Sequence, residues 1–341
     1  MELITLEEHY TDQRVIDANN AFNGERPPLP PERARIMKFL MSKTFPGPEL
    51  LDFKMRVAFM DANHIAVQVL SLTSPVSDYV PAPEALRICR LANDITFGHI
   101  KEYPGRFAGF ATLPMADPKA AADELERCVR DLGFSGALLA GRFKGRFYNE
   151  AEFFPIFERA ARLDVPIYFH PAFIPQEVQD LYYMSEAYSP AVGTEFASAG
   201  YGWHSEVGIQ VVRLILSGLF DKLPGLKVIC GHWGETMPAF LDRMDIILNQ
   251  GLTGLKKKVS EYYKESVYIT PSGIMSESQL DFIVRLMGAD HVLYAVDYPY
   301  MKPENTYGFL MDSSLSEEEK ELIGYKNARK LLHLDMELNH E

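Results

Sequence analysis

Cysteine is scarce in this sequence, which has three in 341 residues, at Cys89, Cys128 and Cys230. An odd number of widely separated cysteines, none in a CxxC pair, argues against a disulfide framework and against a zinc knuckle. Cys230 lies in an apolar run, where a free cysteine usually serves as a small buried hydrophobic residue. A reducing compartment suits such a chain, and we expect a cytoplasmic protein.

Basic residues are also in the minority, because 34 Lys and Arg stand against 47 Asp and Glu and leave a formal net charge of −13. This excess of negative charge repels phosphate backbones and anionic lipids. The sequence has no apolar run of membrane-spanning length, and residues 1–9 lack the basic stretch and apolar core of a signal peptide. We therefore expect neither nucleic acid nor a membrane as a partner.

The composition, 47% hydrophobic and 24% charged, is that of a globular protein, and two patterns alternate along the chain. Short apolar runs predict eight strands, and amphipathic patterns between them predict helices. The expected strands are Leu3–His9, Ile65–Leu72, Phe107–Leu113, Gly136–Ala140, Pro166–His170, Leu226–His232, Val267–Thr270 and His291–Asp297. The expected helices include Lys119–Leu132, Glu150–Leu163, Glu206–Phe220, Pro238–Asn249 and Glu277–Met287.

This alternation predicts parallel βαβ units. Eight units with no repeat or long linker favour one closed (β/α)8 TIM barrel over residues 1–341, with a doubly wound sheet as the alternative. Two longer segments, Phe22–Leu50 and Phe173–Trp203, follow the carboxyl ends of expected strands. We expect both to be loops that cover a pocket at the mouth of the barrel.

Residues able to bind a metal ion lie at the ends of four expected strands. Glu7 and His9 are two residues apart on the first strand, so regular alternation places them on one face. The fifth, sixth and eighth strands end in His170, His232 and Asp297. Each residue alone fits a solvent contact, a cap or a turn, but together at a barrel mouth they favour a site.

Seven motifs spread almost from end to end carry a family resemblance. They are Leu6–His9 (LEEH), Arg106–Pro114 (RFAGFATLP), Leu132–Ala137 (LGFSGA), Val165–Pro171 (VPIYFHP), Gly231–Glu235 (GHWGE), Thr270–Gly273 (TPSG) and Asp297–Pro299 (DYP). Together they resemble the amidohydrolase superfamily. The resemblance is closer to its metal-dependent nonoxidative decarboxylases, of the γ-resorcylate (2,6-dihydroxybenzoate) decarboxylase type.

The resemblance implies a role for each matching residue. It implies that a divalent cation is bound, that His232 is catalytic, and that Glu235 and Arg243 support the reaction, Arg243 by binding substrate. It further implies that Asp297 both binds the ion and donates a proton. The implied metal ligands are Glu7, His9, His170 and Asp297.

One ion is expected, because Glu7 replaces the first histidine of the dinuclear hydrolases and the fourth expected strand has no lysine to bridge two ions. Lys144, just beyond that strand, leaves a bridging role open. Two histidines and two carboxylates suit Zn2+ or Mn2+. Tyr10, where these decarboxylases usually have phenylalanine, leaves the substrate open, and His204 is either a substrate contact or a helix cap.

The implied reaction is decarboxylation of an ortho-hydroxybenzoate-type aromatic acid. The carboxylate and phenolic oxygen would chelate the ion, Asp297 would protonate the ring carbon, and CO2 would then leave. His232 would orient Asp297 or polarise the substrate, Glu235 would fix the tautomer of His232, and Arg243 would supply positive charge. Like its relatives, the protein is expected to be a homodimer or homotetramer.

Two other functions remain open on the same scaffold. A mononuclear hydrolase would activate water for attack on a lactone or an amide, with His232 stabilising the oxyanion. A binding protein without activity would have no reason to keep all four strand-end residues. Turnover of an ortho-hydroxybenzoate, hydrolysis of a lactone, or absence of bound metal separates the three.

Overall fold

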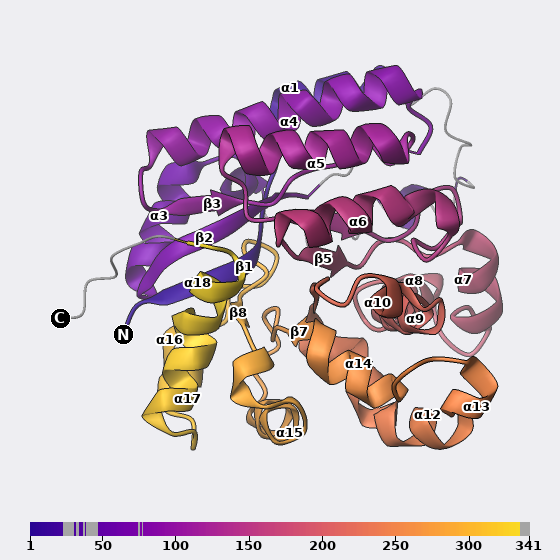
Figure 1. The fold of residues 1–341 in the computed structure, drawn as a ribbon. Helices are drawn as coiled ribbons and strands as arrows, with labels where there is room; N and C mark the ends of the chain where they lie inside the picture. The colour runs from indigo at the N-terminus through magenta and orange to yellow at the C-terminus, as the bar shows by residue number, and fades with distance from the viewer. Residues whose placement is uncertain are drawn as a thin grey trace.

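The computed structural model describes residues 1–22, 31, 34–36, 38, 47–73, 76 and 78–334. Within these residues eight strands alternate with helices (Figure 1). The strands are β1 (Leu3–Tyr10), β2 (Ile65–Leu72), β3 (Phe107–Gly109), β4 (Ala137–Ala140), β5 (Ile167–His170), β6 (Val228–Cys230), β7 (Val267–Ile269) and β8 (Tyr294–Ala295). The α-helices are α1 (Gln13–Asn20), α3 (Phe53–Ala62), α4 (Ala82–Glu102), α5 (Pro118–Leu132), α6 (Phe154–Leu163), α7 (Gln176–Tyr182), α8 (Pro190–Ala197), α9 (Gly202–Leu216), α10 (Leu219–Lys222), α11 (His232–Glu235), α12 (Leu241–Ile247), α13 (Gln250–Thr253), α14 (Val259–Ser266), α15 (Glu277–Met287), α16 (Thr306–Met311), α17 (Glu317–Glu321) and α18 (Asn327–Leu331).

The strands form a closed parallel barrel. Two four-stranded sheets have the orders β3-β2-β1-β8 and β4-β5-β6-β7. Single parallel bridges, Ala111 to Ala137 and Ile269 to Val292, join the sheets at both edges. Every strand therefore has a neighbour on each side, and the predicted (β/α)8 barrel is confirmed.

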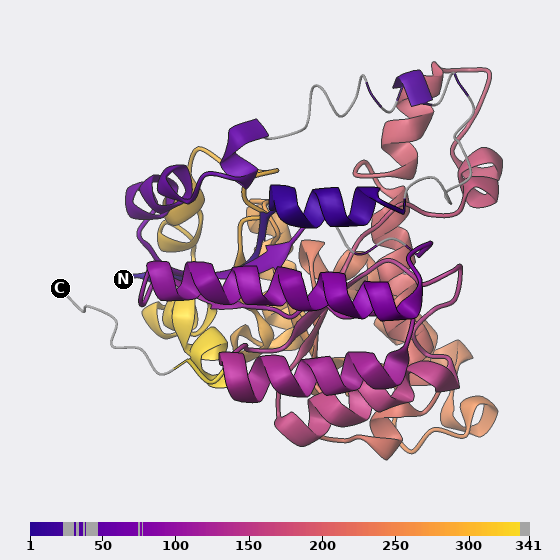
Figure 2. The same ribbon diagram turned by 90° about the horizontal axis from the view of Figure 1, so that it is seen from above.

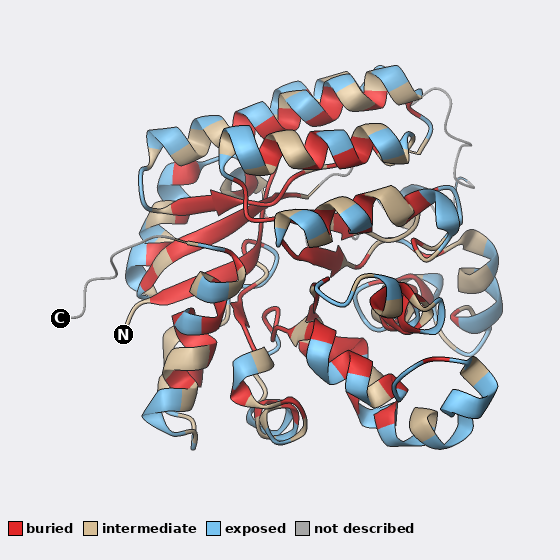
Figure 3. Ribbon diagram, viewed as in Figure 1, coloured by how far each residue is buried: buried red, intermediate tan, exposed pale blue. Residues whose placement is uncertain are grey.

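Hydrophobic side chains fill both the inside of the barrel and the layer between strands and helices. The inner cluster includes Ile4, Leu6, Val67 and Val69, which alternate along β1 and β2. The intervening residues, such as Leu3 and Leu70, belong to the outer cluster beneath the helices. Figure 3 shows the result, with buried strands inside and helices whose outer faces are exposed.

The helix α5 shows how the local sequence sets an outer element. Asp117 caps its N-terminus by accepting hydrogen bonds from two backbone N–H groups, and Gly133 ends it with a φ of 71°. Its buried residues include Ala121, Leu125 and Cys128, which lie on one face. In Figure 2 the long helices α4 and α5 run side by side along the outside of the barrel.

Several predicted boundaries are wrong, and the differences matter at the mouth. The expected strands Phe107–Leu113, Leu226–His232 and His291–Asp297 end early, at Gly109, Cys230 and Ala295. His232 and Asp297 therefore lie on turns just after the strands. Three expected helices also differ: Glu206–Phe220 begins at Gly202 and breaks at Gly218, while Glu150–Leu163 and Pro238–Asn249 each begin with a 3-10 turn.

The two segments expected as loops have different outcomes. Phe173–Trp203 is not a continuous loop, because it contains α7 and α8 before α9 begins. Of Phe22–Leu50, most residues lie outside the described part of the chain, and residues 47–50 form a 3-10 turn. Among the helices that the structure describes, none has both the length and the apolar character to cross a membrane.

Candidate metal centre

Four side chains meet at the carboxyl end of the barrel, from β1, from β5 and from the turn after β8. One ligand atom from each of Glu7, His9, His170 and Asp297 lies within 4.8 Å of the others. His9 Nε2 is 3.3 Å from Asp297 Oδ1, and His170 Nε2 is 3.4 Å from Glu7 Oε1. Glu7 Oε1 and His9 Nε2 are buried without a hydrogen-bond partner. Because such atoms are costly unless satisfied, this mixed N/O donor set fits a divalent cation.

The backbone beneath this cluster is strained. Glu7, His232, Ser272 and Asp297 have φ values of 62°, 45°, 46° and 63°, in the left-handed region that non-glycine residues rarely adopt. Each such residue costs on the order of 1–3 kcal/mol, and such strain concentrates at functional sites. The turns after β6, β7 and β8 and an irregularity in β1 therefore place these side chains at the mouth at the expense of stability.

Hydrogen bonds orient three of the four candidate ligands. His170 Nδ1 lies 2.7 Å from the carbonyl oxygen of Pro171, so it donates and leaves Nε2 as the acceptor toward the cluster. His9 Nδ1 lies 3.0 Å from Ser71 Oγ. The hydroxyls of Tyr168 and Ser272 donate to Glu7 Oε2, which leaves Glu7 Oε1 for the centre.

The protonation states suit metal binding. Burial lowers the pKa of His9 to about 4 and that of His170 to about 3, so both imidazoles are neutral at physiological pH. A neutral imidazole has a free lone pair and is the form that binds metals. Burial raises the pKa of Asp297 to about 7, against the lowering effect of His232.

A second cluster joins His204, Glu235 and His232 beside the first. His232 Nδ1 is 2.8 Å from Glu235 Oε1, and His204 Nδ1 is 2.8 Å from Glu235 Oε2. His232 Nδ1 also lies 3.9 Å from Glu7 Oε1, so the two clusters touch. Burial alone would lower the pKa of His232, but Glu235 and Glu7 outweigh it and raise the pKa to about 10. The pair is therefore an imidazolium beside a fully buried carboxylate.

His204 connects this pair to the segment between β5 and α9. Its Nε2 lies 3.0 Å from the indole N–H of Trp203 and 3.1 Å from the carbonyl oxygen of Ala199. No side chain caps α9, so the helix-cap alternative for His204 is wrong. Sequence reasoning left its role open because the partner, Glu235, is 31 residues away.

Glu8 is a buried residue of the mouth that sequence reasoning did not assign. Its carboxylate accepts hydrogen bonds from the backbone N–H groups of Val296, at 3.0 Å, and Tyr298, at 3.3 Å. Burial raises the pKa of Glu8 to about 8, although the N–H of Val296 and Arg56 act against it. The one feature of the sequence that could have indicated a role for Glu8 is its position between Glu7 and His9.

Three residues named from the sequence lie away from these clusters. Tyr10 is buried in the outer layer, with its hydroxyl 2.5 Å from Thr96 Oγ1. Lys144 is exposed, and its ammonium lies 5.4 Å from the centre of the Phe143 ring. Arg243 is exposed on α12, without an ion pair to any residue that the structure describes.

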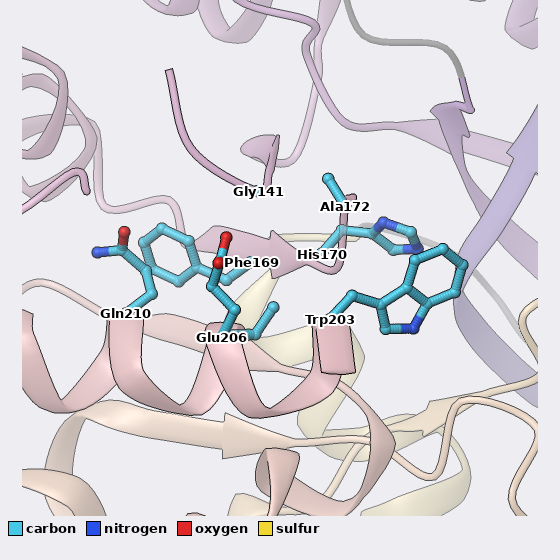
Figure 4. A pocket seen from close by; sticks show the side chains of 8 residues that line it. Gly141, Phe169, His170, Ala172, Trp203, Glu206 and Gln210 are labelled. Atoms are coloured by element: carbon cyan, nitrogen blue, oxygen red, sulfur yellow. The ribbon is translucent and has the colours of Figure 1, made fainter. Parts of the chain in front are cut away.

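Two hollows border the cluster. The first lies between the ends of β4 and β5 and helix α9, and its lining residues include His170, Trp203 and Glu206 (Figure 4). The second lies at the ends of β2, β3 and β4 beside Ser71, the partner of His9. Its other lining residues are Leu72, Phe110, Ala111, Thr112, Leu138 and Ala140, all uncharged.

The chain is similar in sequence to known proteins. A family model described as amidohydrolase matches residues 47–334. Gamma-resorcylate decarboxylase from Polaromonas sp. is 33% identical over 345 residues, which cover 97% of this chain and 98% of that protein.

Two solved structures extend the likeness to the whole fold. A protein assigned as an amidohydrolase from Staphylococcus aureus has a TM-score of 0.86 and 41% identity, over 98% of this chain and all of that one (100%). A dihydroxybenzoic acid decarboxylase from Polaromonas sp., solved with manganese and the inhibitor 2-nitroresorcinol, has a TM-score of 0.82 and 31% identity, over 98% of both chains.

Proposed function

The chain belongs to the amidohydrolase family, and from this premise we propose that it is a metal-dependent nonoxidative decarboxylase of an ortho-hydroxybenzoate-type aromatic acid, for example a dihydroxybenzoate. The observation that carries the proposal is the juxtaposition of the four candidate ligands with the charged His232–Glu235 pair. The named activities of the relatives favour decarboxylation over the alternative of lactone or amide hydrolysis.

Glu7, His9, His170 and Asp297 are proposed to hold one divalent cation, Mn2+ or Zn2+. When bound, the cation would attract the carboxylate and phenolic oxygen of the substrate and stabilise the phenolate. The manganese in the related dihydroxybenzoic acid decarboxylase supports Mn2+ in particular. The uncharged hollow beside Ser71 gives the centre mostly apolar surroundings on that side.

The proposed reaction begins with transfer of a proton from the Asp297 carboxyl to the ring carbon that bears the carboxylate. The phenolate supplies the electron pair for the new C–H bond, and the electrons of the breaking C–C bond then restore the aromatic ring as CO2 leaves. In the protein without a cation, burial raises the pKa of Asp297 to about 7, which favours the protonated carboxyl that this step uses. One proton is consumed in each turnover, and it must return to Asp297 before the next.

The His232–Glu235 pair is proposed to act beside that proton transfer. Because Glu235 holds His232 as an imidazolium, an N–H and a positive charge lie next to the carboxylate of Glu7. This charge would orient the substrate or Asp297 and offset the negative charge of the substrate. Glu235 is therefore proposed to position His232.

Arg243 is proposed as a substrate contact on the family resemblance. Arg243 lies exposed on α12. This role therefore requires a second copy of the chain, with Arg243 of one copy reaching the barrel mouth of the other. Exposed apolar neighbours, Phe240, Ile246 and Ile247, support a homodimer or homotetramer. A monomeric mass in light scattering at micromolar concentration would contradict this assembly.

A cytoplasmic location is proposed because all three cysteines are free and buried. The negative net charge disfavours nucleic acid and anionic membranes as partners. The inhibitor 2-nitroresorcinol in the related decarboxylase supports a small aromatic substrate.

The test combines metal analysis with a substrate panel. Purified protein should hold about one divalent ion per chain, as expected for a single four-ligand site. With Mn2+ added, it should release CO2 from 2,6-dihydroxybenzoate and salicylate but not from 4-hydroxybenzoate, which lacks the ortho hydroxyl. Hydrolysis of an aryl lactone without CO2 release from any benzoate would overturn the proposal.

A further inference from the structure

Glu8 lies between two candidate ligands in sequence, yet it is on the other side of the sheet. The pairing of β1 with β2 shifts between Thr5 and Glu8, where Glu7 has a φ of 62°. Before this irregularity Ile4 and Leu6 lie inside the barrel, and after it Tyr10 belongs to the outer layer. An extra residue in one strand reverses the alternation in this way. Glu8 consequently lies on the outer side of the sheet, where it meets Gln68.

From there Glu8 holds the two peptide groups that flank Asp297. Its Oε1 accepts the N–H of Val296 at 3.0 Å, and its Oε2 accepts the N–H of Tyr298 at 3.3 Å. Asp297 itself has a φ of 63°. A strained turn persists only where the surroundings hold it, and two bonds to one carboxylate do so on both sides of the strained residue.

Two further buried side chains hold Glu8. Gln68 Nε2 donates to Glu8 Oε2 at 3.2 Å, and Arg56 Nη1 donates to Gln68 Oε1 at 3.0 Å. Arg56 also donates through Nη2 to the carbonyl oxygen of His9. Glu8, Gln68 and Arg56 are each 0% exposed. One network thus joins the strand end that bears Glu7 and His9 to the turn that bears Asp297.

We infer that Glu8, supported by Gln68 and Arg56, is a positioning residue that sets Asp297 against Glu7 and His9 in the geometry a divalent cation requires. This inference rests on the proposed ligand set. Each partner of Glu8 named above is a donor, so two carboxylate oxygens match the network and an amide does not. A purely structural role predicts loss of stability alone, whereas positioning predicts loss of metal affinity in the folded protein.

The experiment compares Glu8→Gln with the parent chain by Mn2+ titration, read by electron paramagnetic resonance of the free ion. Glutamine keeps the shape but turns an NH2 group toward a donor. We expect the Kd for Mn2+ to rise roughly 10–100-fold, the usual effect of losing a partner that orients the ligands. At saturating Mn2+, kcat for 2,6-dihydroxybenzoate should fall while KM changes little.

Glu124→Gln is the matched control. Glu124 is also 0% exposed, and it accepts from Asn93, Arg90 and Arg127 in the outer layer, on α5. This variant should lose stability but keep the parental Kd for Mn2+. Equal weakening of Mn2+ binding in both variants would overturn the inference, because general destabilisation would then explain the effect.

A parental Kd in folded Glu8→Gln would also overturn it. Gln68→Leu, which leaves Glu8 in place but removes a donor that holds it, provides a second variant. Gln68→Leu should also raise the Kd for Mn2+. An unchanged Kd in this variant would contradict the inferred role of Gln68 in holding Glu8. Glu7→Gln tests the premise separately, because parental binding in that variant would show that the ligand set itself is wrong.

Discussion

Replacement of Asp297 by asparagine should remove decarboxylation far more completely than it removes metal binding. Asparagine has nearly the same size and retains an oxygen, and Glu7, His9 and His170 remain as ligands. It has no carboxyl proton to transfer. A positioned acid is typically worth about 10²–10⁴-fold in rate, which corresponds to about 2.7–5.5 kcal/mol of activation free energy.

The structure indicates why metal binding should survive. Asp297 Oδ1 is 3.3 Å from His9 Nε2, while Glu7 and His170 form the opposite pair at 3.4 Å. The latter pair is held by hydrogen bonds from Tyr168 and Ser272 to Glu7 and from His170 to the carbonyl of Pro171, and none of these bonds involves Asp297. The remaining ligands therefore keep their orientation, and the lost charge should raise the Kd for Mn2+ without abolishing binding.

The assay measures CO2 release from 2,6-dihydroxybenzoate over a range of Mn2+ concentrations, so that kcat is compared at saturating metal. Metal content is measured on the same samples. His232→Asn is a useful companion, because it should also lower kcat while leaving metal content near the parental value. Near-parental kcat in Asp297→Asn with metal bound would refute the reasoning, and the proton donor would then have to be sought elsewhere.

The barrel could be predicted from the sequence because its signal is periodic and repeated. Eight apolar runs give eight strands, and β2 has the predicted bounds, Ile65–Leu72. Errors occur where the apolar pattern continues beyond the hydrogen-bonded residues. For example, β8 pairs with β1 only through Tyr294 and Ala295, although Val296 continues the apolar run. Hydrophobicity reports burial, and a residue can be buried at a barrel mouth without belonging to a strand.

The convergence of the four candidate ligands was predicted for a reason that is only partly right. Regular alternation puts Glu7 and His9 on one face, but it would also put them on the face opposite to Leu6. In the structure, the irregularity at Glu7 reverses the alternation of β1. Leu6 points into the barrel, and Glu7 and His9 therefore also face its interior, at the mouth. When a residue other than glycine adopts a left-handed backbone conformation, the residue type does not reveal it, so the irregularity could not be predicted from the sequence.

Partners far apart in sequence were beyond prediction. Glu8 and Val296 are 288 residues apart in the sequence. His204 belongs to α9 and Glu235 to α11, and the two side chains are hydrogen-bonded. Arg243 shows the converse case, since the family resemblance implied a place at the substrate while α12 leaves it exposed. Tertiary packing determines which side chains complete a buried hydrogen-bond network. The periodicity of the sequence does not indicate these partners.

Two further predictions concern residues around the centre. His204→Leu should lower kcat about tenfold, because Glu235 loses a charge-assisted hydrogen bond, and metal content should not change; parental kcat would contradict this. The second prediction concerns Glu206, whose pKa is raised to about 7 because burial outweighs its ion pair with Arg142, at 3.0 Å. The folded chain favours the protonated carboxyl, so this contribution to stability is fully present below the ordinary pKa of 4.5 and is lost as pH rises through about 7. Urea unfolding at pH 5 and pH 8 should show that Glu206→Gln flattens the pH dependence by up to about 3 kcal/mol, since each pKa unit is worth about 1.4 kcal/mol. Parallel curves for parent and variant would mean that the ion pair, and not burial, determines the charge of Glu206.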